Sequence, residues 1–143
     1  MSRPERGEAP LSGSAARAEA VLVVGTDQWA IEQAGSQLRA AGRRVLRCHE
    51  PGDATFPCNA LVPGRRCPID VGVDVVLDMR ARPVNPPALN EFGAVCGLHV
   101  GVPLVVAGVP GDSGFGPWAA STVENGVELA AACDAAVAPD TLT

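Results

Sequence analysis

The stretch VDVVLDMRARPVNPPALNEFGAVCGLHVGVPLVVAGV, residues 73–109, decides the fold. Its two ends, VDVVLDM (73–79) and PLVVAGV (103–109), are short, rich in β-branched residues and almost continuously apolar. Strands that are covered on both faces have this character, whereas half-exposed strands alternate between apolar and polar residues. The stretch therefore predicts two buried strands.

A helix is expected between these strands, from about Pro87 to Val100. Leu89, Phe92 and Cys96 have the spacing of one buried helix face, and a proline in the first turn is favourable. A strand, a helix and a second strand in this order predict a parallel β-α-β unit.

Two further strands lie nearer the N-terminus. AVLVVG (20–25) is as apolar as the first two, and RVLRC (44–48) carries an arginine inside it, which suits a sheet edge better than the middle. The segment between them, QWAIEQAGSQLRAAG, places Ile31, Ala34, Leu38 and Ala41 on one helix face. The helix is bounded by two kinds of capping residue: Thr26 or Asp27 at its start and Gly42 at its end.

A third helix is expected over much of 117–136, where Val123, Val127 and Ala130 share a face. Strands that alternate with helices predict an α/β domain with right-handed crossovers. We expect a doubly wound, flavodoxin- or Rossmann-like sheet of four parallel strands, in the order 2-1-3-4, with helices on both faces. Its ligand crevice would lie at the carboxyl ends of strands one and three.

The 143 residues suit one domain, for which we expect 20–138, preceded by a disordered arm, 1–19, that lacks the apolar run of a secretory signal. The uncharged run 92–111 is interrupted by glycines and prolines, which argues against a membrane span. With a net charge of −5 and few aromatic residues, the chain also lacks the basic, aromatic face of a nucleic-acid groove. These features predict a cytoplasmic protein.

The residues that follow each strand are expected to line this crevice. The expected ligand-binding residues are Gly25, Thr26, Asp27, Arg80, Arg82, Gly108, Asp112 and Ser113. The loop 49–72 is too long for a plain connector, and loops of this length often cover a binding site.

Glu91 is the only formally charged residue between Arg82 and Asp112. A carboxylate among apolar neighbours near the crevice would be partly desolvated, which suits a general acid or a nucleophile. The alternative is an ordinary glutamate that faces solvent at a helix N-terminus, where the helix dipole favours it.

The segment VDVVLD, a proline-containing loop, LNEFGAVCGL and the strand VPLVV resemble the core of nucleoside 2-deoxyribosyltransferase-like proteins. The resemblance implies that Glu91 is a nucleophile that attacks the anomeric carbon of a sugar. It implies that Asp78 helps to hold the ribose or the base. The implied activity is hydrolysis or transfer at an N-glycosidic bond.

The long loop offers a rival site. Cys48, His49, Cys58 and Cys67 are four potential soft ligands within 20 residues, and four-coordinate zinc requires such a set. Redox pairing of Cys58 with Cys67 is a second reading, and ordinary loop thiols are a third. In this alternative the protein is a non-enzymatic metal- or redox-sensing module.

Arg65, Arg66, Arg80 and Arg82 form a further constellation that could converge on a phosphate if the loop folds over the crevice, or could simply face solvent. The leading prediction is a small domain that binds a nucleoside or nucleotide. The remaining alternative is a scaffold that binds a partner protein. The sequence leaves open whether the chain forms a homo-oligomer.

Overall fold

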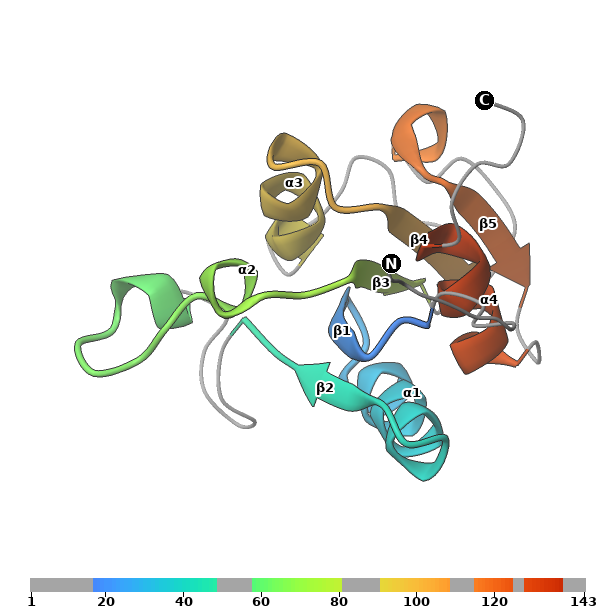
Figure 1. Ribbon diagram of the computed structural model, residues 1–143, viewed down its shortest axis with the longest axis horizontal. Coiled ribbons are helices and arrows are strands. Elements are labelled where there is room, and N and C mark those ends of the chain that lie inside the picture. The colour runs from blue at the N-terminus through green and yellow to red at the C-terminus, as the bar shows by residue number, and fades with distance from the viewer. Residues whose placement is uncertain (1–16, 49–57, 81–90, 109–114, 125–127, 138–143) are drawn as a thin grey trace, which may run out of the picture.

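The protein is built on one parallel sheet of five strands in the order β2-β1-β3-β4-β5 (Figure 1). The computed structural model describes residues 17–48, 58–80, 91–108, 115–124 and 128–137. The strands are β1 (Ala20–Gly25), β2 (Arg44–Leu46), β3 (Val75–Arg80), β4 (Leu104–Gly108) and β5 (Ser121–Glu124). The α/β class and the doubly wound order 2-1-3-4 of the first four strands are confirmed.

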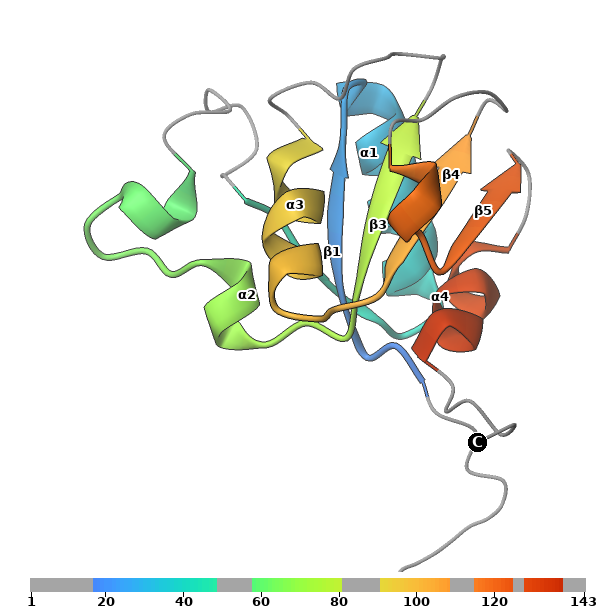
Figure 2. The same cartoon turned by 90° about the horizontal axis from the view of Figure 1, so that it is seen from above.

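Helices cover both faces of the sheet (Figures 1 and 2). The face that carries α1 (Gln28–Ala40) and α4 (Leu129–Val137) lies opposite the face that carries α3 (Phe92–His99). The short helix α2 (Pro68–Val71) packs on the α3 side through Ile69. The described residues also contain two 3-10 turns, η1 (Asn59–Leu61) and η3 (Gly116–Trp118).

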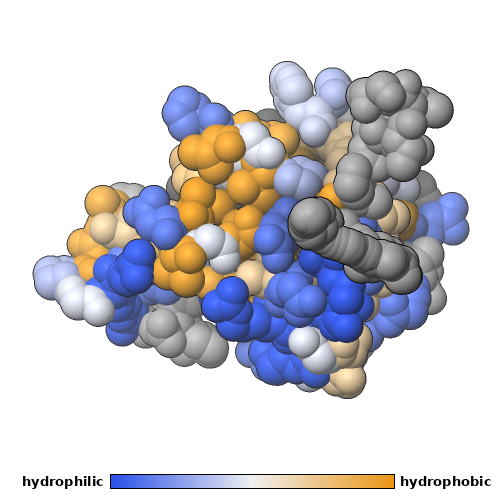
Figure 3. Space-filling model, in the orientation of Figure 1, coloured by the Kyte–Doolittle hydropathy of each residue, from blue (hydrophilic) through white to orange (hydrophobic). Residues whose placement is uncertain are grey.

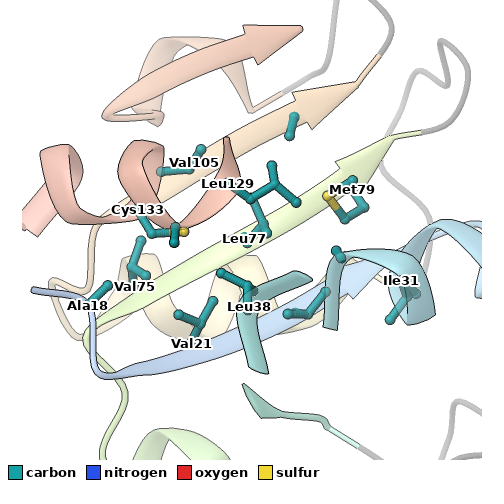
Figure 4. Close-up of a cluster of buried hydrophobic side chains, with 14 residues drawn as sticks. Ala18, Val21, Ile31, Leu38, Val75, Leu77, Met79, Val105, Leu129 and Cys133 are labelled. Atoms are coloured by element: carbon teal, nitrogen blue, oxygen red, sulfur yellow. The ribbon is translucent and has the colours of Figure 1, made fainter. Parts of the chain in front are cut away.

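Each central strand divides its side chains between two apolar layers. On β3, Val75, Leu77 and Met79 pack against α1 and α4 in the layer drawn in Figure 4, and Val76 packs on the α3 side. All six residues of β1 and all six of β3 are buried. The continuously apolar sequence runs are therefore explained by helices on both faces.

Helix α1 follows its sequence prediction. The side chain of Asp27 accepts a hydrogen bond from the backbone N–H of Ala30 at 3.2 Å and caps the helix. Ile31, Ala34 and Leu38 are buried, and the turn after the helix is made by Gly42 at a φ of 83°.

The fifth strand corrects the predicted third helix. Ser121–Glu124 pairs in parallel with β4, and α4 begins only at Leu129. Ser121 and Val123 are half-buried while Thr122 and Glu124 are exposed, which is the period of two expected of an edge strand. Val127 lies outside the described residues, and Val123 belongs to the strand rather than to a helix face.

Two of the three residues predicted for the buried face of α3 were wrong, and the third, Leu89, lies outside the described residues. Phe92 and Cys96 are exposed, whereas Gly93, Ala94 and Gly97 face the sheet. A β-carbon at Gly93 would come within 2.7 Å of a Val24 side-chain carbon, so only glycine permits this close approach. The helix packs with its small residues inward because the sheet leaves no room for large ones.

A polar clasp joins the first strand to the last helix. The backbone N–H of Ala18 donates to Asp134 Oδ1 at 2.8 Å, and Arg43 Nη2 donates to Asp134 Oδ2 at 3.0 Å. Arg43 Nη1 also donates to the Ala18 carbonyl at 3.3 Å. The hydrogen bond from Arg43 lowers the pKa of Asp134. Of the predicted arm, 1–19, residues 1–16 lie outside the described part, and Ala18 is buried in this clasp.

The long segment after β2 contains η1 and α2 where a single loop, 49–72, was expected. Within the described part of the chain, no helix has both the length and the apolar character that crossing a bilayer requires.

Candidate functional site

Asp78 lies inside the sheet, near the carboxyl end of β3. It is paired in register with Val24 of β1 on one side and Val106 of β4 on the other. It follows Val76 at a spacing of two, so its side chain points to the α3 face, and it is 0% exposed. A carboxyl group thus occupies a place where the neighbouring strands supply only valine.

Glu91 is the N-cap residue of α3, and its side chain lies next to that of Asp78. Its side chain is also 0% exposed, and its Oε2 lies 3.3 Å from Nε of Arg80, the last residue of β3. The prediction that the acid could be an ordinary solvent-facing glutamate is therefore wrong. Asp78, Arg80 and Glu91 form one buried cluster, which we call the carboxyl cluster.

Burial raises the pKa of Asp78 to about 9, and hydrogen bonding to Glu91 and repulsion from its charge act in the same direction. Arg80 opposes the shift. In the described part of the chain no N–H or O–H group donates to either oxygen of Asp78, so a protonated Asp78 that donates to Glu91 satisfies the pair. At neutral pH Asp78 is then the protonated member of the cluster, beside the ion pair of Glu91 and Arg80.

Gly108 closes the cluster on the side of β4. It pairs with Arg80 across the sheet, has a φ of 137°, and a β-carbon there would overlap the carbonyl oxygen of Arg80. The predicted ligand-binding glycine is therefore needed for the close packing of β3 and β4.

The other predicted crevice residues have separate positions. Gly25 ends β1, Thr26 is half-buried after it, and the carboxylate of Asp27 caps α1. The predicted residues Arg82, Asp112 and Ser113 lie outside the described part. The structure thus brings together Asp78, Glu91 and Arg80, and leaves Asp27 in a structural role.

A cavity of about 540 Å³ lies beside the edge strand β2, between α1 and the segment that contains η1 and α2. Three arginines line it, Arg39 from α1, Arg47 after β2 and Arg66 before α2. Among the described lining residues Glu32 is the one carboxylate, so the formal charge of those side chains is positive. We call this cavity the β2 cavity.

The arginines that were predicted to converge on a phosphate do not all lie at the β2 cavity. Arg66 lines it, while Arg80 is buried in the carboxyl cluster. Arg65 donates to Asn59 Oδ1 at 3.4 Å, and Asn59 is itself buried in the lining. Sequence reasoning missed Arg39 and Arg47, although Arg39 lies one helical turn from the buried Gly35 and Arg47 directly follows an edge strand.

Four cysteines gather between α3 and the segment after β2. Burial raises the pKa of Cys48 to about 12, and the charges of Cys96, Cys58 and Cys67 add to the shift. A β-carbon at Gly93 would lie 2.8 Å from Cys48 Sγ, so this thiol touches α3. Cys96 of α3 thus lies close to the three thiols of the loop that the sequence analysis singled out.

The described cysteines are free thiols, and no three His, Cys, Asp or Glu side chains among the described residues are arranged to hold a metal ion. His49 of the predicted zinc set lies outside these residues. Zinc binding by Cys48, His49, Cys58 and Cys67 stays a prediction.

No family model and no curated protein matches the sequence. Among solved structures, the chain is similar to the solution structure of a response regulator protein from Burkholderia multivorans, with a TM-score of 0.50 and 14% sequence identity. The similarity covers 87% of this chain and 98% of the other. At this identity it establishes the fold alone, a flavodoxin-like domain with a five-stranded parallel sheet.

Proposed function

We propose that the protein is a ligand-binding domain whose β2 cavity takes a small phosphate-bearing molecule of the nucleotide class. The observation that carries the proposal is the lining of Arg39, Arg47 and Arg66 around about 540 Å³. Guanidinium groups bind phosphate oxygens through paired, charge-assisted hydrogen bonds.

The charge of the cavity supports an anionic ligand. The whole chain carries a net charge of −5, yet the described lining of this cavity has three arginines and one glutamate. Such a local excess of positive charge attracts an anion in spite of the opposite charge of the whole molecule.

The size and the remaining lining support a ligand larger than a free anion. The volume lies within the roughly 300–1,000 Å³ of small-molecule sites. Ile31, Val45 and Leu46 supply an apolar wall on which a base or a similar ring could pack.

Calorimetric titration with nucleoside 5′-monophosphates, the matching nucleosides and inorganic phosphate tests this function. We expect the monophosphates to bind, and Arg39→Ala and Arg66→Ala each to weaken binding by about 10- to 100-fold, since a hydrogen bond to a charged group contributes about 1.5–3 kcal/mol. Arg44→Ala is the matched control, because Arg44 is exposed on β2 and does not line the cavity. Equal binding of nucleoside and nucleotide, or equal loss in the control, would contradict the proposal.

Cleavage or transfer at an N-glycosidic bond by Glu91 is the catalytic extension of this proposal. It is supported by the contact between Glu91 and Asp78, the two residues that the resemblance selects. It also requires movement, because Glu91 is fully buried, is paired with Arg80 and does not line the β2 cavity. Chromatography of nucleosides incubated with the protein tests it: free base that is released by the wild type and not by folded Glu91→Gln supports catalysis.

Metal sensing is a second candidate, favoured by the proximity of the four thiols. Burial, and after it the charges of the neighbouring thiols, raise the pKa of Cys48 and of Cys96, and a bound cation would favour these two thiolates instead. Elemental analysis of protein purified with added zinc, beside a Cys58→Ser and Cys67→Ser double variant, tests it. About one equivalent of zinc that is lost in the variant supports the candidate, and less than about a tenth in the wild type contradicts it.

A further inference from the structure

Helix α3 presents to solvent one continuous stripe that is apolar apart from His99. Its exposed residues have the spacing i, i+3, i+4, i+7 and i+8, which is one face of a helix. They are Phe92, Val95, Cys96, His99 and Val100, the last of which ends the helix. Phe92 is 55% exposed, Val95 48% and Val100 58%. Figure 3 shows hydrophobic residues gathered on the surface over this part of the molecule.

The stripe follows from how α3 packs. Gly93 and Gly97 set the helix close to the sheet, where a β-carbon at Gly97 would come within 2.6 Å of a Val76 side-chain carbon. The small residues thus make the contact with the core, and the large apolar residues are left outside. A helix that is apolar on both faces is normally covered on both faces.

The charge of the stripe selects among possible partners. It holds no arginine and no carboxylate, while the chain carries a net charge of −5. Helices that lie on membranes place basic residues beside their apolar face, and nucleic acid requires a basic surface. A second copy of the same uncharged face meets no like charge, so it is the partner that these side chains suit.

We propose that two copies of the chain associate through α3, with the stripe of one packed against the stripe of the other about a two-fold axis. Such an interface is self-complementary, because each residue meets the same surface of its partner. Cys96 is the middle residue of the stripe, so the two Cys96 thiols lie near the axis. Five side chains from each copy make a small interface, and interfaces that bury less than about 1,200 Å² in total are typical of weak association.

Sedimentation velocity over about 5–500 µM protein tests the dimer, in the concentration range expected for an interface of this size. We expect a monomer to dimer shift with concentration, and Val95→Glu to abolish it by placing two carboxylates in the contact. Trp29→Glu is the matched control, since Trp29 is 71% exposed on α1, on the opposite face of the sheet. Val95→Ser serves as a milder second variant, and the thermal midpoint of each variant confirms folding.

A thiol cross-linker locates the interface. Treatment with a short bis-maleimide, which adds one thiol at each end without any redox step, is expected to give a covalent dimer in the wild type. The dimer should be lost in Cys96→Ser and kept in Cys67→Ser.

A monomer at all concentrations, or a dimer that survives both Val95→Glu and Cys96→Ser, overturns the proposal. Flotation of the monomer with anionic phospholipid vesicles also overturns it, and would assign the stripe to a membrane surface instead.

Discussion

Asp78 and Glu91 place two carboxyl groups against each other beneath α3, and neither side chain is exposed to solvent. Such a pair is compatible with burial at neutral pH because one member keeps its proton and the other faces Arg80.

Asp78→Asn should remove a pH dependence of stability. The pKa of Asp78 is about 9 in the folded protein and 3.8 as its ordinary value, so between these limits the folded state binds more protons than the unfolded state. Stability should therefore fall as pH rises from about 4 to 9, by up to about 1.4 kcal/mol per pH unit from this group. Urea denaturation from pH 5 to 9 should give a flatter profile for Asp78→Asn than for the wild type.

Asp70→Asn, at an exposed aspartate on α2, should retain the wild-type slope. Parallel profiles for wild type and Asp78→Asn would mean that Asp78 is ionised in the folded protein.

Glu91→Gln should lower the free energy of unfolding by about 3 kcal/mol, because it takes the carboxylate away from the buried guanidinium of Arg80. In the double variant with Arg80→Met, the two losses should not add, since the second substitution removes the charge that Glu91 faces. Denaturant unfolding of all four proteins gives the coupling energy. Additivity within about 0.5 kcal/mol would show that the two residues do not interact.

Asp27→Ala should destabilise the protein by about 1 kcal/mol, the usual effect of losing a helix cap. Asp27→Ser should retain most of the stability, because serine also accepts the hydrogen bond that Ala30 N–H donates. Thermal unfolding of the two variants separates the capping role from a ligand-binding role. If serine is as harmful as alanine, the cap is not what Asp27 contributes.

Alkylation by iodoacetamide at pH 8 should be slow at Cys48 and Cys133. Burial raises the pKa of each thiol to about 12, so the reactive thiolate is roughly 10⁻⁴ of the population. Peptide mass spectrometry should show both residues labelled at least about 100-fold more slowly in the native protein than in guanidinium chloride. Equal rates in the two conditions would contradict the burial of these thiols.

The fold could be predicted where the sequence pattern had a single physical meaning. β1 and β4 are continuously apolar, and β3 is apolar apart from Asp78 and Arg80, because both faces of the sheet are covered. Helix α1 carries its own cap and its own apolar face. β5 was missed because four residues, half-buried in alternation, are too short a pattern to override the helical spacing around them. The buried face of α3 was missed because large apolar residues suggested a core contact that Gly93 and Gly97 make instead.

The candidate site could be predicted only in part. The position of Glu91 at the start of the helix after β3 placed it near the crevice, whereas Asp78 was selected only by the resemblance. Arg80 could have been assigned to the same cluster, since it lies two residues from Asp78 and therefore on the same face of the strand. The β2 cavity could not, because it depends on how the segment after β2 returns to α1, and no local pattern specifies that path.

The clasp among Ala18, Arg43 and Asp134 has a consequence for protein engineering. It holds the segment before β1 close to helix α4, so the domain could be inserted into a host protein through two neighbouring junctions. For the same reason, a short linker between these two segments would allow a circular permutation, with new termini placed in another loop and the sheet left intact.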